Sequence, residues 1–107
     1  MPTSGARYFI SVNYRFQPKR KFDEQGDYPE LPGVYRLMHE NRLVRIGESD
    51  DMQRRLKEHY REYADQVDEF DFAVIRSDTA RMSEQKRMLN EYKDAYGSLP
   101  KLNPICA

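Results

Sequence analysis

The chain has a single cysteine, no apolar run long enough to cross a membrane, and no net charge at neutral pH. Cys106 cannot form an internal disulfide, which agrees with a reducing compartment. Because it lies beside the C-terminal end, we interpret it as incidental rather than nucleophilic. The N-terminal segment also lacks the basic and then apolar layout of a secretory signal. We therefore expect a cytoplasmic protein without membrane contact.

The absence of net charge argues against a generic DNA-binding protein. Such proteins bind through Lys and Arg side chains that neutralise phosphates, and here 18 acidic side chains balance 18 basic ones. The charges are unevenly spread, however: every charged side chain of residues 65–71 is acidic, whereas all but one of the charged side chains of residues 53–61 are basic. The basic side chains there are Arg54, Arg55, Lys57 and Arg61. Two interpretations stay open: a basic helix that presents one face to phosphate, or solvated charges on ordinary helices.

The first third of the chain predicts one strand followed by a long connection. Side chains alternate over residues 8–16 as in a half-buried strand, with Tyr, Ile, Val, Tyr and Phe on one face. Residues 17–32 are polar and proline-containing, and they carry a basic cluster of Lys19, Arg20 and Lys21. A connection of this length is unusual in a compact domain, so we expect it to be functional or mobile.

The middle of the chain predicts a hairpin, a helix and a further strand. Residues 33–38 and 42–47 are short apolar-rich segments, and Asn41 between them adopts turn conformations at low cost. Residues 49–51 supply capping oxygens for a helix that begins at Met52, and residues 70–75 predict the strand. The predicted buried stripe of the helix is Met52, Leu56, Tyr60 and Tyr63.

A second helix is predicted near the C-terminal end. Asp78 or Thr79 can cap its start, and Gly97 is suited to end it. Its predicted stripe is Met88, Leu89, Tyr92, Ala95 and Tyr96. These elements predict an α+β fold: a small antiparallel sheet of three core strands and an extra N-terminal strand, flanked by helices. We assign residues 1–32 to an N-terminal extension and residues 33–107 to the functional part of one compact domain.

Candidate site residues begin on the first predicted helix. Arg55 and His59 are one turn apart along one edge of the buried stripe, whereas Arg54 falls near the solvent side. Arg55 is therefore the arginine able to reach a cleft beside the sheet. Taken alone, the pair is more often an ordinary boundary feature, with Arg55 bound to an acidic neighbour.

Three further side chains offer chemistry of the same kind. Tyr35 follows Gly33 on the hairpin, and a phenol beside a cation can accept a proton from water. Glu84 and Glu91 lie two turns apart on the second helix, and one carboxylate with waters and phosphate suffices for Mg²⁺. Asn103 follows Pro100 in a rigid tail. Each residue alone is more often a core aromatic, a solvated charge or a turn residue.

In combination, residues 31–104 resemble the GIY-YIG nuclease domain. Gly33-Val34-Tyr35 matches its first motif strand, and Arg45-Ile46-Gly47 stands at the second. Arg55, His59, a helix glutamate and the Pro100–Asn103 spacing follow in the order of the family. The resemblance implies a three-stranded antiparallel sheet packed by helices, and cleavage of DNA with one divalent ion, Mg²⁺ or Mn²⁺.

The resemblance also implies a role for each matched residue. Glu84 holds the metal, Arg55 steadies the scissile phosphate and Tyr35 acts as the general base. His59 moves a proton or orients a phosphate, and Asn103 supports the site. Such a site stabilises the charge that develops on the reacting phosphate.

The chain departs from the family at two positions. Arg45 replaces the second motif tyrosine, and it can bind phosphate, lower the pKa of Tyr35 or face outward. Glu91 is an alternative metal ligand to Glu84, because it lies twelve residues before Asn103 as in some relatives. We expect a metal-dependent DNA endonuclease, with specificity from the basic segments, a protein partner or self-association. The alternative is an impaired module of the same fold that binds nucleic acid or a protein. The expected nucleic-acid-binding side chains are Lys19, Arg20, Lys21, Arg54, Lys57 and Arg61.

Overall fold

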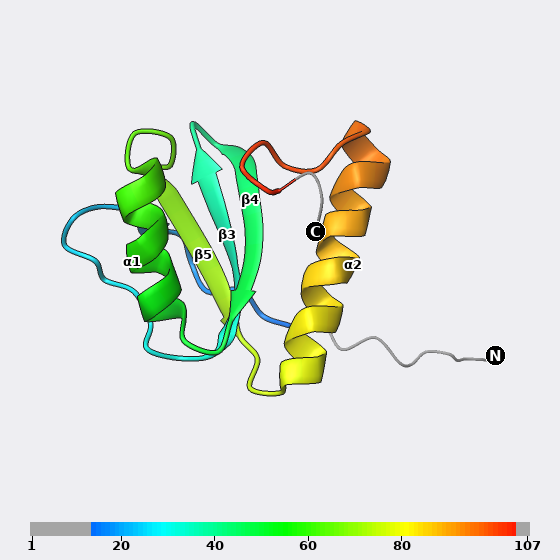
Figure 1. Ribbon diagram of the computed structural model, residues 1–107, viewed down its shortest axis with the longest axis horizontal. Helices are drawn as coiled ribbons and strands as arrows, with labels where there is room; N and C mark the ends of the chain where they lie inside the picture. The colour runs from blue at the N-terminus through cyan, green and yellow to red at the C-terminus, as the bar shows by residue number, and fades with distance from the viewer. Residues whose placement is uncertain (1–13, 105–107) are drawn as a thin grey trace.

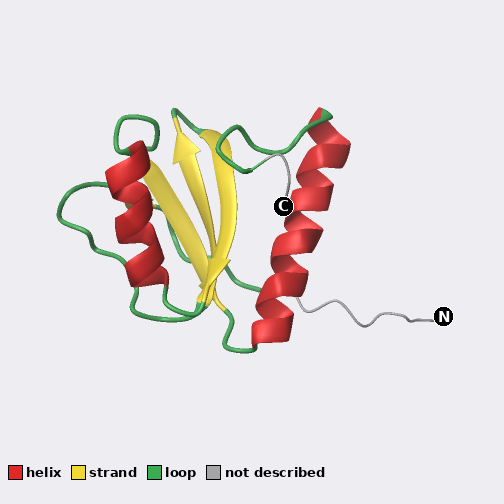
Figure 2. Ribbon diagram, in the orientation of Figure 1, coloured by secondary structure: helices red, strands yellow, loops and turns green. Residues whose placement is uncertain are grey.

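The computed structural model describes residues 14–104, which form an antiparallel sheet between two helices (Figures 1 and 2). The sheet order is β2-β5-β3-β4. Helix α1 covers one face and α2 the other. The elements in chain order are β2 (Arg20–Lys21), β3 (Gly33–His39), β4 (Arg42–Ser49), α1 (Met52–Tyr63), β5 (Glu69–Val74) and α2 (Asp78–Tyr96). The predicted α+β class and small antiparallel sheet are confirmed.

A tight turn joins β3 and β4. Glu40 and Asn41 both have positive φ, 52° and 66°. Two successive residues with positive φ form a two-residue turn whose twist matches the right-handed twist of the strands that it joins. The predicted hairpin is confirmed, and Asn41 occupies the turn position expected of it.

The alternation of side chains along β3 and β4 divides the interior into two layers. Tyr35 and Leu37 point toward α1 and pack with Leu56 of that helix. Val34 and Ile46 point toward α2 and pack with Met88. Successive residues of a strand face opposite sides of the sheet, so side chains on one face are separated from those on the other by the backbone of the sheet.

The long connection between residues 17 and 32 is tied to the layer on the α1 side. Phe22 and Tyr28 are buried there, and both rings contact the ring of Phe70 edge-on. The backbone N–H of Met52 donates to the carbonyl of Leu31. Residues 20–32 therefore belong to the same core as the rest of the domain. Of the strand predicted over residues 8–16, residues 8–13 lie outside the described residues. The rest of it, together with the residues up to 19, has no regular secondary structure. Cys106 is also outside them.

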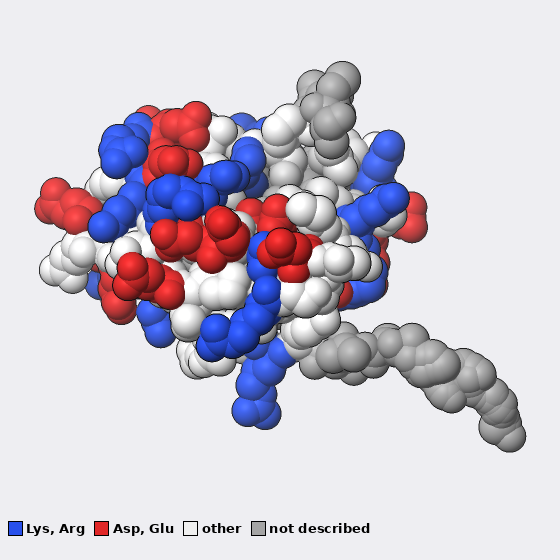
Figure 3. All heavy atoms as spheres, turned by 60° about the horizontal axis from the view of Figure 1, so that its bottom comes forward, with Lys and Arg blue, Asp and Glu red and all other residues white. Residues whose placement is uncertain are grey.

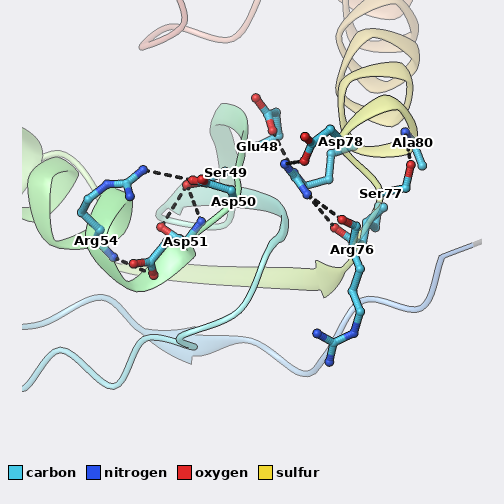
Figure 4. A network of polar contacts seen from close by, with 11 residues as sticks. Glu48, Ser49, Asp50, Asp51, Arg54, Arg76, Ser77, Asp78 and Ala80 are labelled. Carbon is cyan, nitrogen blue, oxygen red and sulfur yellow. Dashed lines mark hydrogen bonds and ion pairs between the residues drawn. The ribbon is translucent and has the colours of Figure 1, made fainter.

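Side-chain caps begin both helices (Figure 4). The Asp51 carboxylate accepts from the backbone N–H of Arg54, as the sequence predicts. The cap of α2 is Ser77, so the prediction of Asp78 or Thr79 is wrong by one position. The Asp78 carboxylate pairs instead with Arg81, which leaves the cap to the preceding hydroxyl. Gly97 ends α2 with a φ of 83°, as expected of a C-terminal glycine.

The predicted stripe of α2 is only partly buried. Met88 is buried, and Leu89 and Tyr92 are half-buried against the same layer. Ala95 and Tyr96 are exposed because they border an open groove instead of the packed core. Neither helix within residues 14–104 is long and apolar enough to span a membrane.

Candidate functional site

A buried tyrosine and histidine meet between the sheet and α1. Tyr35 lies in the middle of β3, and its hydroxyl is 2.7 Å from Nε2 of His59. The Tyr35 ring occupies the space above Gly47 on the neighbouring strand. A Cβ at position 47 would lie 2.3 Å from Cζ of Tyr35. Glycine at this position therefore makes room for the phenol to reach the helix.

Two arginines bring positive charge to this tyrosine–histidine pair. Arg45 lies on β4 opposite Leu37, so its side chain projects from the same face as Tyr35. Arg55 precedes His59 by one turn of α1. Both guanidinium groups lower the pKa of Tyr35 and of His59. The structure thus brings together four predicted site residues, which we call the Tyr35 cluster: Tyr35, Arg45, Arg55 and His59.

Burial keeps the phenol and the imidazole of the cluster neutral. Desolvation raises the pKa of Tyr35, and the two arginines only partly offset this effect. Desolvation also lowers the pKa of His59 to about 4, assisted mainly by the charge of Arg45. The Glu62 carboxylate is 3.5 Å from Nδ1 of His59, which favours the tautomer with the proton on Nδ1. In that tautomer, Nε2 accepts a hydrogen bond from the Tyr35 hydroxyl.

The cluster contains the polar atoms that the protein leaves unpaired. Within residues 14–104, the buried side-chain nitrogens without a hydrogen-bond partner are Nε of Arg45, Nε of Arg55 and Nδ1 of His59. Glu58 lies 3.2 Å from Nε of Arg55. Neither this contact nor that of Glu62 with His59 has the alignment of a hydrogen bond. Buried polar groups are nearly always paired, so the gathering of unpaired donors at one place is typical of a ligand site.

The C-terminal tail closes one side of the cluster. The Asn103 side chain accepts from the backbone N–H of Ile46 and donates to its carbonyl, both at 2.9 Å. It thereby pairs with the outer edge of β4 as an additional strand would. One residue earlier, the carbonyl of Leu102 accepts from Nη1 of Arg45 at 2.6 Å. Asn103 therefore fixes the tail that holds Arg45, and its supporting role in a functional site stays a prediction.

The structure does not bring Glu84 into the Tyr35 cluster. Glu84 lies on α2, in a groove that Arg36 and Ile46 line from the opposite face of the sheet. Its two carboxylate oxygens accept from Nε and Nη2 of Arg87 at 2.8 and 2.6 Å. Glu91 is exposed and accepts from Nη1 of the same arginine. The metal role assigned to Glu84 requires it to lie in one pocket with Tyr35 and Arg55, and the structure places it on the other face of the sheet.

A metal ion finds no complete set of protein ligands among the described residues. No group of three His, Cys, Asp or Glu side chains within residues 14–104 is arranged to hold one. The carboxylates beside the Tyr35 cluster are those of Glu58 and Glu62, and both are largely exposed. The metal role of Glu84, or of Glu91, stays a prediction, and in this conformation Arg87 competes for it.

The predicted nucleic-acid-binding residues fall into two separate groups. Lys19, Arg20 and Lys21 lie at the β2 edge, three strands from β4 and hence about 14 Å from it at the usual strand spacing. The other group, on α1, consists of Arg54, Lys57 and Arg61, all exposed.

The charges around these two groups are mixed rather than segregated. Arg54 pairs with Asp50 at 3.1 Å, and Arg20 lies 3.8 Å from Asp27. Basic and acidic side chains are interleaved over the face seen in Figure 3. The structure thus favours the interpretation of solvated and paired charges over that of a continuous basic face.

Glu58 and Glu62 were not predicted from the sequence as parts of the site. Each lies three positions after a cluster residue on α1, Glu58 after Arg55 and Glu62 after His59. Residues three apart on a helix are neighbours on its surface, so the spacing was the available signal.

No protein-family model, curated protein or solved structure matches this chain.

Proposed function

We propose that this protein is a DNA endonuclease of the GIY-YIG kind that binds a phosphodiester at the Tyr35 cluster. The observation that carries the proposal is the convergence of two guanidinium groups on a buried phenol–imidazole pair, with unpaired nitrogens on three of the four side chains. Guanidinium groups match the oxygens of a phosphate in charge and geometry. A phosphate would thus supply acceptors for nitrogens that make no aligned hydrogen bond within the fold.

Each residue of the cluster has a distinct part in this proposal. Arg55 and Arg45 hold the phosphate and stabilise the charge that grows on it as water attacks. The Tyr35 oxygen accepts a proton from that water while passing its own proton to Nε2 of neutral His59. With a pKa of about 4, His59 is neutral at neutral pH, so its Nε2 has a lone pair to receive this proton.

A divalent ion would add Lewis-acid chemistry to such a reaction. Its predicted ligand Glu84 lies on the other face of the sheet and is bound by Arg87. The roles proposed for Tyr35, His59 and the two arginines involve only this chain's own side chains. Whether the ion is held by Glu84 is thus a separate part of the prediction, with its own test below.

A second candidate function is a non-catalytic module that binds nucleic acid or a protein partner. Two specific observations favour it. Arg45 stands where the family has its second tyrosine, and its guanidinium is engaged with the tail. Arg87 neutralises Glu84, the carboxylate on which metal-dependent cutting would depend. DNA is the substrate in the first candidate and one of the two possible ligands in the second. The cytoplasmic location stays a prediction.

A cleavage assay separates the two candidates. Branched, nicked and intact duplex DNA are incubated with the protein and Mg²⁺ or Mn²⁺, and nicking is followed on a denaturing gel. The endonuclease proposal expects metal-dependent nicking that falls about a hundredfold or more in Tyr35→Phe, because the proton acceptor is lost. Tyr63→Phe is the matched control, since its ring lies near His59 but makes no hydrogen bond to it. DNA binding without cutting under any condition supports the second candidate.

The role of Glu84 is tested with the same substrates. If Glu84 holds the ion, Glu84→Gln abolishes cutting, while Glu91→Gln, which removes the other carboxylate bound to Arg87, leaves it largely intact. The reverse result identifies Glu91 as the ligand. Equal cutting by both variants excludes either carboxylate as the sole ligand.

A further inference from the structure

The contact between Tyr35 and His59 permits a hydrogen bond in either direction. The Tyr35 oxygen lies 2.7 Å from Nε2 of His59, and a hydroxyl can donate or accept. If Nε2 of the neutral ring carries the proton, it donates to the phenol oxygen. If Nδ1 carries the proton, Nε2 accepts from the hydroxyl. Only the second arrangement leaves Nε2 able to take a proton from Tyr35, so the tautomer decides whether the pair can act as a base.

The side chain that distinguishes the two tautomers is Glu62. Nδ1 of His59 is buried and makes no hydrogen bond, and a carboxylate oxygen of Glu62 lies 3.5 Å from it. An ionised carboxylate only accepts hydrogen bonds, so it is favourable opposite an N–H and unfavourable opposite a nitrogen lone pair. The Glu62 side chain is 60 % exposed. It can therefore rotate into alignment with Nδ1 without disturbing the core.

Glu62 also balances the charge that His59 acquires when it accepts a proton. Burial lowers the pKa of His59, and the charges of Arg45 and Arg55 lower it further, whereas Glu62 raises it. The imidazolium form is therefore opposed by two cations of the Tyr35 cluster and stabilised by this carboxylate. Glu62 thus acts on both the neutral and the protonated ring.

A second carboxylate of α1, that of Glu58, faces a different member of the cluster. Glu58 precedes Glu62 by one turn, and it lies 3.2 Å from Nε of Arg55. Glu62 forms no ion pair with a lysine or arginine within residues 14–104. The contact of Glu62 with His59 is therefore not a by-product of a surface ion pair.

We infer that Glu62 is a positioning residue: it holds the proton of neutral His59 on Nδ1 and so keeps Nε2 open to the Tyr35 hydroxyl. This inference rests on the proposed function and deepens it, because it names the group that sets the direction of proton transfer. The same logic applies wherever a carboxylate fixes the tautomer of a histidine base.

The proton movements follow from this assignment. The attacking water gives a proton to the Tyr35 oxygen while the Tyr35 proton moves to Nε2 of His59. The water oxygen forms its bond to phosphorus as the bond from phosphorus to the leaving oxygen breaks, and solvent protonates the leaving oxygen. His59 then carries a proton on each ring nitrogen and faces the charge of Glu62. Loss of the Nε2 proton to solvent restores the starting tautomer.

Nitrogen NMR of protein labelled with ¹⁵N-histidine, without DNA or metal, tests the tautomer at pH 7. Chemical shifts distinguish a protonated from an unprotonated ring nitrogen, and His39→Gln identifies the signals of His59. In the wild type, Nδ1 of His59 should be protonated and Nε2 should not. Glu62→Ala should shift the ratio of the two tautomers about tenfold toward protonated Nε2, because a charge-assisted hydrogen bond is lost.

The matched control is Asp65→Ala. Asp65 is an exposed acid just beyond the end of α1 and makes no hydrogen bond or ion pair with His59. Its replacement removes the same charge from the same end of the helix and should leave the tautomer ratio unchanged.

Kinetics on branched DNA with Mg²⁺ or Mn²⁺ test the role in the reaction. Glu62→Ala should lower kcat about tenfold with little change in KM, because Glu62 acts on proton transfer and not on the bound phosphate. Asp65→Ala should change neither constant. In a His59→Gln background, Glu62→Ala should have no further effect, since residues that act through one another are not additive.

Failure of this inference is distinguishable from failure of the proposed function. If the wild type cuts DNA but Glu62→Ala matches Asp65→Ala in tautomer ratio or in kcat, the role of Glu62 is refuted while the proposed function stands. The same holds if the effects of Glu62→Ala and His59→Gln on kcat multiply, or if the wild type carries its proton on Nε2. If the tautomer depends on Glu62 as expected but the wild type cuts no DNA, the proposed function is refuted, and the role in the reaction falls with it.

Discussion

The two faces of the sheet differ in how completely the hydrogen-bonding groups of their arginines are satisfied. On the α2 face, Arg36 holds Asp71 with two hydrogen bonds of 2.8 and 2.6 Å, and Arg87 holds Glu84 in the same manner. On the α1 face, Arg45 and Arg55 each keep a buried Nε without a hydrogen bond, although Nε of Arg55 lies 3.2 Å from the Glu58 carboxylate and Nη1 of Arg45 donates to the carbonyl of Leu102. Charges that are already paired by the protein stabilise the fold. Buried donors without a hydrogen bond, beside a buried phenol, are instead available to a ligand, which is why we propose that a phosphate binds on the α1 face.

The two faces also differ in how much apolar packing they provide, and a pair of truncations measures this. Phe70→Ala should lower the free energy of unfolding by about 4 kcal/mol, because this fully buried ring contacts the rings of Phe22, Tyr28 and Phe72. Met88→Ala on the α2 face should cost about 2 kcal/mol. Urea unfolding measures both values. A larger effect of Met88→Ala would reverse the comparison.

Acid should destabilise the α1 face through His59. Its pKa is about 4 in the folded protein and 6.5 for an unperturbed histidine. Between these two pKa values, His59 is therefore protonated in the unfolded chain and neutral in the folded protein. The stabilisation is complete above pH 6.5 and is lost as the pH falls toward 4, amounting to about 3 kcal/mol between pH 7 and pH 4. The unfolding free energy of the His59→Gln variant, measured over the same pH range, should lose much of this pH dependence. The control variant His39→Gln, changed at the turn end of β3, should retain it.

Gly47→Ala should damage the site from the neighbouring strand. The added methyl group overlaps the Tyr35 ring, which is buried and has no free space to move into. We expect a loss of about 2 kcal/mol in unfolding free energy, together with the loss of DNA cutting. Gly97→Ala is the control: its φ of 83° makes it mildly destabilising, but its Cβ meets nothing and lies away from the cluster. Unchanged cutting by a folded Gly47→Ala protein would contradict this account of Tyr35.

The smallest expected changes in unfolding free energy come from two carboxylates on the α2 face. Glu84→Gln should cost about 1 kcal/mol, because Glu84 is nearly buried and accepts two hydrogen bonds from Arg87. Glu91→Gln should cost only a few tenths of a kcal/mol, since its ion pair with Arg87 is exposed. Thermal unfolding of the two variants side by side gives the difference. An equal effect would mean that burial of the Glu84 pair contributes nothing.

Local patterns in the sequence predicted most of the fold. The hairpin, both helices, strand β5, the cap at Asp51 and the stop at Gly97 all follow from capping, turn and periodicity rules that depend on near neighbours. Pairing of β2 with β5 and burial of Phe22 and Tyr28 depend on contacts between residues that lie about 40 to 50 positions apart in the sequence. The polar sequence of residues 17–32 contains no local sign of them.

The site was predictable only where one element fixed the geometry. The spacing of Arg55 and His59 on α1 follows from the helix period. The position of Tyr35 above Gly47 was not predicted, because it depends on the register of two strands. The face on which α2 packs is a tertiary property, so the placement of Glu84 across the sheet from Tyr35 was not predictable from its spacing. Pairing of Glu84 with Arg87 at i+3 was visible in the sequence, but only the structure identifies it as the dominant contact of that carboxylate.

The most direct test of the central claim compares two adjacent arginines of α1. Arg55 belongs to the Tyr35 cluster, whereas Arg54 is exposed and paired with Asp50. Replacement of either arginine by alanine removes the same charge from neighbouring positions. Folding of both variants is first checked by circular dichroism. Their nicking rates on branched DNA are then measured with Mg²⁺ or Mn²⁺. The account predicts a loss of about a hundredfold or more in Arg55→Ala and a change of no more than about threefold in Arg54→Ala, which is within the effect of an exposed charge. Equal rates for the two variants would contradict it.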